Sequence, residues 1–408
     1  MKKLIFYLLA LWLALLPWHA FLKTWTASLF LGSNADFLPI TSNVASLWKE
    51  ILLIIILFCL FILTRREKIF LNKSLLVGFG AYILSIIIWG GASSPSLSAF
   101  ILGLRTDLLF LVALAGGYYA AHFLEAENIQ KLLKVLTISL ILCFSIFLLF
   151  WIFIPNIGLH FGYSPYQSSY VENKPLPIYH CIFLGDSCLP RLQASAAGPN
   201  QAASLAILLL GLLAILPVHP LFFTLPFLAL FLTFSRSAFV GTIIALFTQL
   251  TNKWKLRVSL GLLVILSILF ALAPAIITHG LSSLEHWEKT TDGIQRILQQ
   301  PWGSGLGSVG PVARRLFGEN NALISENWYL QIGEEAGIVT MFLLILLTIG
   351  IIKNLLSSKN KFSKVIGAVL LATSIQALFL HLWEDSVVTM LIWFWVGVGL
   401  CYNTNETI

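Results

Sequence analysis

Three arginines lie next to or within apolar stretches of this sequence, where a guanidinium group is expensive to keep. Arg236 stands inside "LFLTFSRSAFVGTIIALF", Arg191 precedes "LQASAAGPNQAAS", and Arg105 lies at the start of a long apolar run. A charged side chain at the bilayer centre costs about 3 kcal/mol or more, so it persists where a partner meets it. Planar guanidinium groups bind phosphate oxygens through paired hydrogen bonds. The arginines therefore predict an anion site, and a lipid pyrophosphate offers two adjacent anions at this depth.

Polar groups also enter the apolar segment that follows "ISENWYLQIGEEAGIV". Asn327, Gln331 and Glu334 have i, i+4, i+7 spacing, which places them on one helical face, and Glu326 precedes them. Two interpretations stay open: a stripe that lines a cavity, or an interfacial helix cap beside aromatic anchors. Acids near the arginines indicate proton transfer to or from a hydroxyl group.

Simpler interpretations compete at several of these positions. Asn200 follows a proline, as helix-capping residues often do, and Arg191 fits a solvated loop charge as well as a functional one. Arg105 could pair with Asp107 or extend outward to the membrane surface.

Cys181 and Cys188 are close in sequence in a segment that we expect outside the membrane. An oxidising compartment favours a disulfide between them over two free thiols. No His, Asp, Glu or Cys spacing indicates a metal site, and no phosphate-binding loop of the G-x-x-x-x-G-K-[ST] type occurs. We predict neither a metal nor another cofactor.

The composition indicates the elements that must position these residues. The chain has 408 residues, of which 58% are hydrophobic and 11% are charged, and its mean hydropathy is +0.89. Soluble domains are about a quarter charged, and an apolar run of about 18 residues can span a bilayer. We predict an all-α polytopic membrane protein with a single integral membrane domain over residues 1–408.

About twelve transmembrane helices are predicted. Their approximate ranges are 4–22, 47–64, 74–92, 103–121, 132–155, 201–217, 220–234, 237–250, 258–278, 337–354, 364–381 and 386–402. The first resembles a signal peptide, but its long apolar stretch favours an uncleaved span. With both termini in the cytoplasm, the cytoplasmic segments collect most of the lysines and arginines, as the positive-inside rule requires.

The range 220–250 decides this orientation. One helix of that length would measure roughly 45 Å, too long for a hydrocarbon core of about 30 Å. Two short helices with a break at "FSRS" keep the basic "TNKWKLR" inside and put Arg236 at the outer membrane edge.

Two long extracytoplasmic loops remain, about 156–200 and 279–336, and loops of this length usually carry function. Residues 284–299 of the second loop predict an amphipathic helix at the membrane interface. Its apolar face would contain Leu284, Trp287, Ile294, Ile297 and Leu298. The glycines of "PWGSGLGSVGP" indicate a tight turn with close approach of the backbone to a ligand or neighbour.

Four segments together resemble the O-antigen ligase and polymerase superfamily of bacterial membrane glycosyltransferases. They are "RLQASAAGPNQAASLAILLL", "LTFSRSAFVG", "HWEKTTDGIQRILQQPWGSGLGS" and "ENWYLQIGEEAGIV". The resemblance covers about residues 190–350 and implies a GT-C-like helical membrane fold. It also implies transfer of a glycan from an undecaprenyl-pyrophosphate carrier to an acceptor hydroxyl, on the outer face of the bacterial cytoplasmic membrane and without a cofactor.

The resemblance implies roles for individual residues. Arg191 and Arg236 would hold the donor pyrophosphate, with Arg105 as a third contributor and Asn200 and Asn327 in support. The lipopolysaccharide ligases typically have histidine before the last asparagine, where this chain has Glu326. Glu326 or His286 would then be the general base. The departure leaves a lipid A-core acceptor, another acceptor and a polymerase reaction open.

The expected partners are the carrier-linked donor, a glycan, lipid or protein acceptor, and membrane lipids, but no nucleic acid. A transporter or flippase of a lipid-linked or anionic solute, and a non-catalytic membrane assembly subunit, are the competing functions. Transporters usually place polar groups near the membrane midplane, whereas the unusual charges here cluster at one face. The sequence identifies neither the sugar, its linkage and the acceptor nor the oligomeric state.

Overall fold

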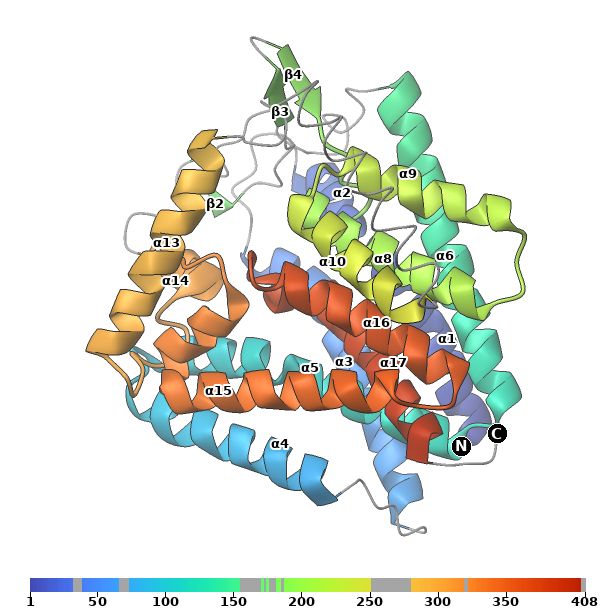
Figure 1. The fold of residues 1–408 in the computed structure, drawn as a ribbon, viewed down its shortest axis with the longest axis horizontal. Helices are drawn as coiled ribbons and strands as arrows, with labels where there is room; N and C mark the ends of the chain where they lie inside the picture. Colours follow the sequence, from blue (N-terminus) through green and yellow to red (C-terminus); the bar gives the residue numbers. More distant parts are fainter. Residues whose placement is uncertain are drawn as a thin grey trace.

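Helices form most of the chain in the computed structural model, which describes residues 1–31, 39–65, 73–154, 170–171, 174–175, 181–184, 187–250, 280–318 and 322–404 (Figure 1). The first helices are α1 (Lys2–Leu15), α2 (His19–Leu31), α3 (Pro39–Thr64), α4 (Lys73–Ser85), α5 (Leu97–Phe123) and α6 (Ala126–Phe153). They are followed by α8 (Pro199–Ile215), α9 (Thr224–Leu232), α10 (Arg236–Gln249), α13 (Gly280–Gln299) and α14 (Gly310–Phe317). The last are α15 (Trp328–Leu356), α16 (Lys361–Gln376) and α17 (Ser386–Thr404).

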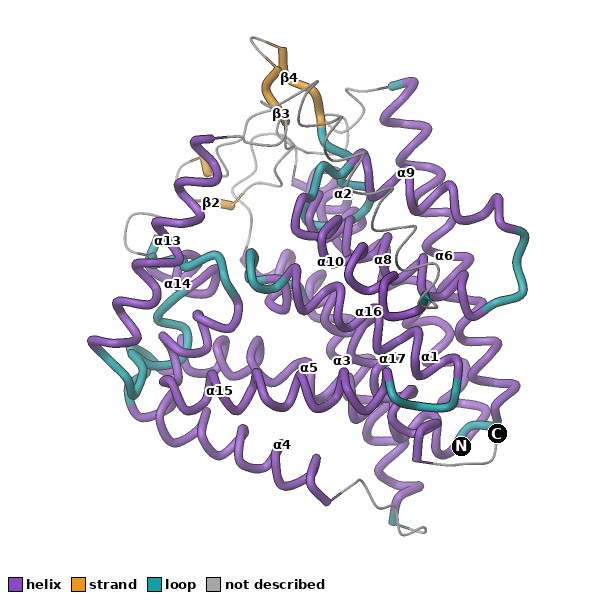
Figure 2. Tube along the Cα trace, in the orientation of Figure 1, coloured by secondary structure: helices purple, strands orange, loops and turns teal. Residues whose placement is uncertain are grey.

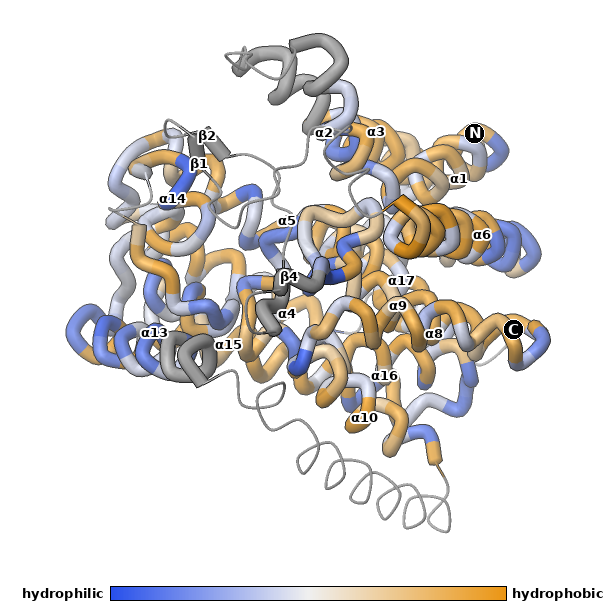
Figure 3. The backbone as a smooth tube through the Cα atoms, turned by 90° about the horizontal axis from the view of Figure 1, so that it is seen from above, coloured by the Kyte–Doolittle hydropathy of each residue, from blue (hydrophilic) through white to orange (hydrophobic). Residues whose placement is uncertain are grey.

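The protein is a helical membrane protein. Within the described residues, 6 helical segments are long and apolar enough to cross a bilayer: Lys2–Thr26, Leu47–Thr64, Lys73–Gly90, Leu97–Phe123, Ala126–Phe153 and Trp328–Leu356. Shorter apolar helices cover Pro199–Ile215, Pro220–Leu232 and Ser386–Tyr402. Hydrophobic residues follow most of α1, α6, α8 and α10 in Figure 3, whereas α13 carries many hydrophilic ones. The predicted span 258–278 lies outside the described residues.

The first long loop differs from the all-α prediction, because it contains two short antiparallel hairpins (Figure 2). One pairs β1 (Tyr170–Val171) with β2 (Lys174–Pro175), and the other pairs β3 (Cys181–Leu184) with β4 (Ser187–Pro190). The sequence contained a signal for the second hairpin, since Gly-Asp between two short runs of strand-forming residues is typical of a tight hairpin turn.

Small residues let α5 and α17 approach one another closely. A Cβ atom at Gly117 would lie 1.8 Å from the carbonyl oxygen of Phe394, and one at Gly397 would lie 2.0 Å from that of Leu114. Ala113 lies one turn before Gly117 and is fully buried. Without a hydrophobic driving force between helices in lipid, backbone approach at such residues is a main source of association. This pair fixes the centre of the bundle.

The helices α1 and α17 run antiparallel. Pro17, just after α1, lines a pocket with Val387 at the start of α17, and the rings of Trp12 and Phe394 lie 5.6 Å apart further along both helices. The beginning of α1 and the end of α17 therefore lie on the same side of the molecule (Figure 1). This agrees with the predicted placement of both termini on one side.

The predicted break inside 220–250 is confirmed. Helix α9 ends at Leu232 and α10 begins at Arg236. Between them Phe234 has a φ of 50°, a left-handed conformation that interrupts a right-handed helix. The break places Arg236 on the first turn of α10.

A second break lies within α15, where Gly337 has a φ of 88° and a ψ of 164°. The glycine-rich segment 301–310 occupies this break. Ser304 N donates to Glu334 O at 2.7 Å, Gly305 N donates to Glu335 O at 2.9 Å, and Ile338 N donates to Pro301 O at 2.9 Å. Backbone groups freed by a break at membrane depth need such partners.

The glycines in this segment are required by its close approach to neighbouring backbone. A Cβ atom at Gly303 would lie 2.5 Å from Glu335 O, and one at Gly305 would lie 2.2 Å from Ser93 O; both residues have positive φ. The predicted tight turn with close backbone approach is therefore confirmed, and the neighbour is the protein itself.

Candidate active site

Arg191 is held in place by two neutral acceptors. It follows β4, and its Nε donates to the carbonyl oxygen of Thr233 at 2.7 Å while Nη2 donates to Oδ1 of Asn200 at 3.0 Å. Thr233 lies in the break between α9 and α10, and Asn200 lies in the first turn of α8. Burial, and then the charge of Arg236, lower the pKa of Arg191 to about 10.

The Asn200 side chain binds Arg191 and does not cap the helix. Gly198 is the N-cap residue of α8, and no side chain caps that helix. The Asn200 side chain accepts from Arg191, and its backbone oxygen accepts from Gln376 Nε2 at 2.8 Å. The capping interpretation is wrong, and the position fits the predicted supporting role.

Arg236 is exposed and lies within electrostatic range of Arg191, three residues after the Thr233 carbonyl group that accepts from Arg191. It is the first residue of α10, where free backbone N–H groups and the helix dipole favour anions. The structure therefore brings together two of the three predicted pyrophosphate ligands at one helix start.

Arg105 belongs to a different group of charges. Its guanidinium forms an ion pair with Glu50, whose Oε1 also lies 3.1 Å from Nζ of Lys49. The charged neighbour that acts on Arg191 is Arg236, whereas Arg105 acts on Lys49. The structure does not place Arg105 with the Arg191–Arg236 pair.

The two candidate general bases contact one another. Nδ1 of His286, on α13, lies within hydrogen-bond distance of Oε2 of Glu326, and Nζ of Lys289 lies 2.6 Å from Oε1 of the same carboxylate. Burial alone would raise the pKa of Glu326, but the hydrogen bonds and charges of His286 and Lys289 outweigh it and lower the pKa to about 2. The two predicted candidates thus form one acid–base pair, in which a neutral His286 can accept a proton.

The backbone at Glu326 is shaped to present its side chain to α13. Glu326 has a φ of 53°, an uncommon conformation for a residue with a Cβ atom. The next residue, Asn327, is the N-cap of α15, and its Oδ1 accepts from Tyr329 N at 2.9 Å and Leu330 N at 3.1 Å. Asn327 is therefore a helix cap that supports Glu326 through the backbone, but Trp328 and Tyr329, the predicted aromatic anchors at the membrane interface, are buried within the protein.

Arg314 and His381 lie within electrostatic range of this acid–base cluster, whereas the sequence predicts His381 as a solvated charge in the last outer turn. The Nδ1 atom of His381 is buried without a hydrogen-bond partner among the described residues. Burial lowers the pKa of His381 to about 4, while the charges of Glu326 and Arg314 act on it in opposite directions. The turn that carries His381 is joined to α15 by the bond from Trp328 N to Ala377 O, at 3.0 Å.

The remaining polar residues of α15 have partners of their own. Gln331 Nε2 donates to Glu384, and Nε of Arg296 lies 2.5 Å from Oε1 of Glu334. Burial raises the pKa of Glu384 to about 8. The polar residues on this face of α15 thus lie inside the protein, where they bind α13 and the turn before α17.

Helix α13 is amphipathic, and its predicted face needs one correction. Trp287, Ile294 and Leu298 are exposed, as an interfacial face requires. Ile297 instead is buried, because it packs against Gly333 of α15. The side chain of Leu284 lies outside the described residues. The inner face of α13 is left to present His286 and Lys289 to Glu326.

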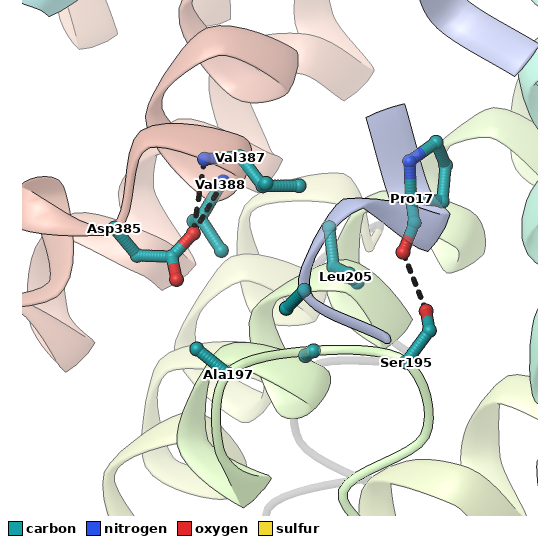
Figure 4. A pocket seen from close by; sticks show the side chains of 9 residues that line it. Pro17, Ser195, Ala197, Leu205, Asp385, Val387 and Val388 are labelled. Atoms are coloured by element: carbon teal, nitrogen blue, oxygen red, sulfur yellow. Dashed lines mark hydrogen bonds between the residues drawn. The ribbon is translucent and has the colours of Figure 1, made fainter. Parts of the chain in front are cut away.

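A small pocket of about 10 Å³ lies between residues 195–197, Pro17 and the start of α17 (Figure 4). Asp385 faces it, but its Oδ1 accepts from Val387 N at 3.0 Å and Val388 N at 2.9 Å. Ser195, on the opposite wall, donates to the carbonyl oxygen of Pro17 at 2.5 Å. These polar groups are engaged in holding the fold, so the pocket supplies no nucleophile.

The predicted disulfide falls on side chains outside the described set. In the β3–β4 register Cys181 is opposite Pro190, and Cys188 is opposite Phe183. The described residues contain no group of three or more His, Cys, Asp or Glu side chains that could hold a metal ion.

The described residues thus contain a pair of neighbouring arginines and a separate acid–base cluster. Two guanidinium groups can stabilise a leaving phosphate, while an imidazole oriented by a carboxylate can take a proton from a hydroxyl group. No protein-family model matches this chain, and a search of curated proteins finds no similar protein.

Proposed function

We propose that this protein transfers a glycan from an undecaprenyl-pyrophosphate carrier to an acceptor hydroxyl, as a membrane glycosyltransferase of the O-antigen ligase and polymerase type. The observation that carries the proposal is the adjacent Arg191 and Arg236 at the start of α10, with Arg191 oriented by Asn200 and Thr233. Two neighbouring guanidinium groups suit the two phosphates of a pyrophosphate, because each can bind phosphate oxygens through paired hydrogen bonds.

The reaction follows from these groups. The acceptor oxygen forms a bond to the anomeric carbon, and the bond from that carbon to the carrier pyrophosphate breaks. The leaving pyrophosphate keeps the electron pair and is stabilised by Arg191 and Arg236. The hydroxyl proton passes to His286, which Glu326 orients and whose positive charge Glu326 then stabilises.

The finer topology belongs to this proposal. It includes about twelve spans, a GT-C-like arrangement, and an active face outside the bacterial cytoplasmic membrane. Break positions and charge asymmetry support it, because both place the arginines and the acid–base cluster away from the termini. A disulfide between Cys181 and Cys188 would suit that compartment.

Ligase and polymerase reactions of this type differ in the acceptor alone. In a ligase the acceptor is another lipid, glycan or protein, and in a polymerase it is a second carrier-linked glycan. Deletion of the protein separates them: accumulation of long carrier-linked chains indicates a ligase, and accumulation of single repeats indicates a polymerase.

The test is transfer of a labelled glycan by the purified full-length protein from its undecaprenyl-pyrophosphate carrier. We expect wild type to release undecaprenyl pyrophosphate and Arg236→Ala to lose about 10²–10³-fold of this rate while remaining in the membrane. Lys134→Ala, an exposed change at the other end of the bundle, is the matched control. Full transfer by Arg236→Ala would exclude the donor-binding role.

One observation favours a second function, a transporter or flippase. Helix α15 is broken at Gly337, and discontinuous helices are common at transporter binding sites. In this protein, however, the segment 301–310 supplies hydrogen-bond partners at the break. Uptake of a lipid-linked or anionic solute into proteoliposomes, without any transfer product, would select this function instead.

A further inference from the structure

Ser235 is the N-cap residue of helix α10, but its side chain does not cap the helix. Its backbone N donates to Thr233 Oγ1 at 3.3 Å. The Oγ atom of Ser235 is buried without a hydrogen-bond partner among the described residues, and the residue as a whole is 2% exposed. Neither bulk water nor the described part of the protein therefore satisfies this hydroxyl group, and a buried polar group of this kind needs an explanation.

Two other helices show how an N-cap side chain ordinarily behaves in this protein. Ser96 caps α5, because its Oγ accepts from Ala99 N at 3.1 Å. Asn360 caps α16, because its Oδ1 accepts from Phe362 N at 2.8 Å. A serine at an N-cap normally accepts from the second or third N–H group of its helix. At α10 the serine oxygen leaves these N–H groups to another acceptor, and its own O–H group remains a donor.

The start of α10 lies against the segment that carries Arg191. Leu192 N donates to Leu232 O at 2.8 Å. Arg191 Nε donates to Thr233 O at 2.7 Å. Ser235 therefore lies two residues after the carbonyl group that orients Arg191. The start of a helix favours anions, because its first N–H groups lack partners within the helix and its dipole is positive there. Hydroxyl, N–H and guanidinium donors thus occur together in this short region.

We propose that Ser235 is a further binding residue for the lipid pyrophosphate, and that one phosphate oxygen accepts from Ser235 Oγ and from N–H groups at the start of α10. This inference rests on the proposed function and adds a third group to Arg191 and Arg236. The two arginines supply positive charge for the pyrophosphate. The hydroxyl and N–H groups are neutral donors with fixed directions, so they orient the phosphate group to which they bind.

The test compares Ser235→Ala with wild type by titrating undecaprenyl pyrophosphate into the full-length protein in phosphatidylcholine nanodiscs. We expect the substitution to weaken binding about tenfold, as for one hydrogen bond to a charged group. The midpoint of thermal unfolding without ligand should stay unchanged, because Ser235 makes no cap bond. Asn360→Ala is the matched control. It removes a side chain that does cap its helix, so it should lower the unfolding midpoint and leave binding unchanged.

Three outcomes overturn the proposal. Full affinity in Ser235→Ala would exclude a contact between the hydroxyl group and the pyrophosphate. A lowered unfolding midpoint in Ser235→Ala would assign the hydroxyl group to the fold. Loss of wild-type binding when excess phosphatidylglycerol is added would identify a site for ordinary phospholipid headgroups.

A second variant and a separate result keep this test decisive. If Ser235→Ala does not fold, Ser235→Gly removes the same hydroxyl group and gives the same comparison, since glycine is well accepted at N-cap positions. Failure of the proposed function would appear differently, as unchanged affinity for undecaprenyl pyrophosphate in Arg191→Gln/Arg236→Gln.

Discussion

Arg191 and Arg236 lie beside one another as like charges, whereas His286 and Lys289 lie against the opposite charge of Glu326. Arg191 is held by a carbonyl and an amide oxygen, which orient the guanidinium without neutralising it. In the second region the protein supplies its own counter-charge. The difference is that Arg191 is oriented by neutral groups beside a second cation, as our proposed pyrophosphate site requires, while Glu326 is held between two basic side chains.

Reversing the charge of Arg236 is expected to separate ligand binding from fold stability more strongly than any other change. We expect Arg236→Glu to lower glycan transfer by at least about 10²-fold, because a charge that stabilises the leaving pyrophosphate is lost. The same change turns repulsion with Arg191 into attraction, so the free energy of unfolding should stay constant or rise by up to about 1 kcal/mol. Transfer rates and thermal unfolding in detergent measure both effects. Arg236→Lys is the control and should retain part of the activity.

In the second region, Glu326→Gln should remove stability in a pH-dependent manner. The pKa of Glu326 is lowered to about 2 in the fold, below its unfolded value, so its ion pairs stabilise the protein fully above about pH 4.5. That contribution, up to about 3 kcal/mol, should decline as the pH falls from 4.5 towards 2. Thermal unfolding of wild type and variant should therefore differ at pH 7 and converge in acid. A constant difference at every pH would contradict the ion-pair assignment.

A substitution in the glycine-rich segment tests whether the Glu326 region can be disturbed without a change at the Arg191–Arg236 pair. Gly303→Ala places a Cβ atom 2.5 Å from Glu335 O at a φ of 90°, so we expect a loss of about 2 kcal/mol in unfolding free energy. Gly350→Ala, whose Cβ atom meets nothing within 4 Å, is the matched control. Pyrophosphate binding at Arg191 should survive in Gly303→Ala while transfer falls. Equal stability of the two variants would show that the segment can move away from α15.

Asn200→Ala is the mildest change, because it leaves both arginines in place. The hydrogen bond to Arg191 is lost, and with it part of the orientation of the guanidinium. We expect affinity for undecaprenyl pyrophosphate to fall about tenfold, as for one hydrogen bond to a charged group. Isothermal titration with the lipid in nanodiscs measures this. Unchanged affinity would mean that the Thr233 carbonyl alone orients Arg191.

The arginine pair was largely predictable from the sequence, since helix length and charge placement located the break before Arg236. The clustering around Glu326 was only partly predictable. Its two candidate bases were identified, but the sequence could not reveal that they contact one another, because α13 and α15 meet through packing at Gly293 and Gly333. His381 was missed for the same reason, since a backbone hydrogen bond between distant segments brings it there.

Arg105 shows the limit of arguing from a residue type at a membrane edge. Its sequence setting resembles those of Arg191 and Arg236, yet its carboxylate partner lies on α3, 55 positions away in sequence. The apolar residues around an arginine show that its charge is costly there, but they do not identify the residue that pairs with it. Tertiary packing decides which arginine lies against a carboxylate and which against neutral oxygen atoms.

A double-mutant cycle on the affinity for undecaprenyl pyrophosphate tests most directly whether Arg191 and Arg236 hold the same pyrophosphate. The four proteins are wild type, Arg191→Gln, Arg236→Gln and the double variant. We predict a loss of at least about tenfold for each single change, and a combined loss well below the product of the two. Losses that multiply independently, or a single change without effect, would contradict a shared pyrophosphate site.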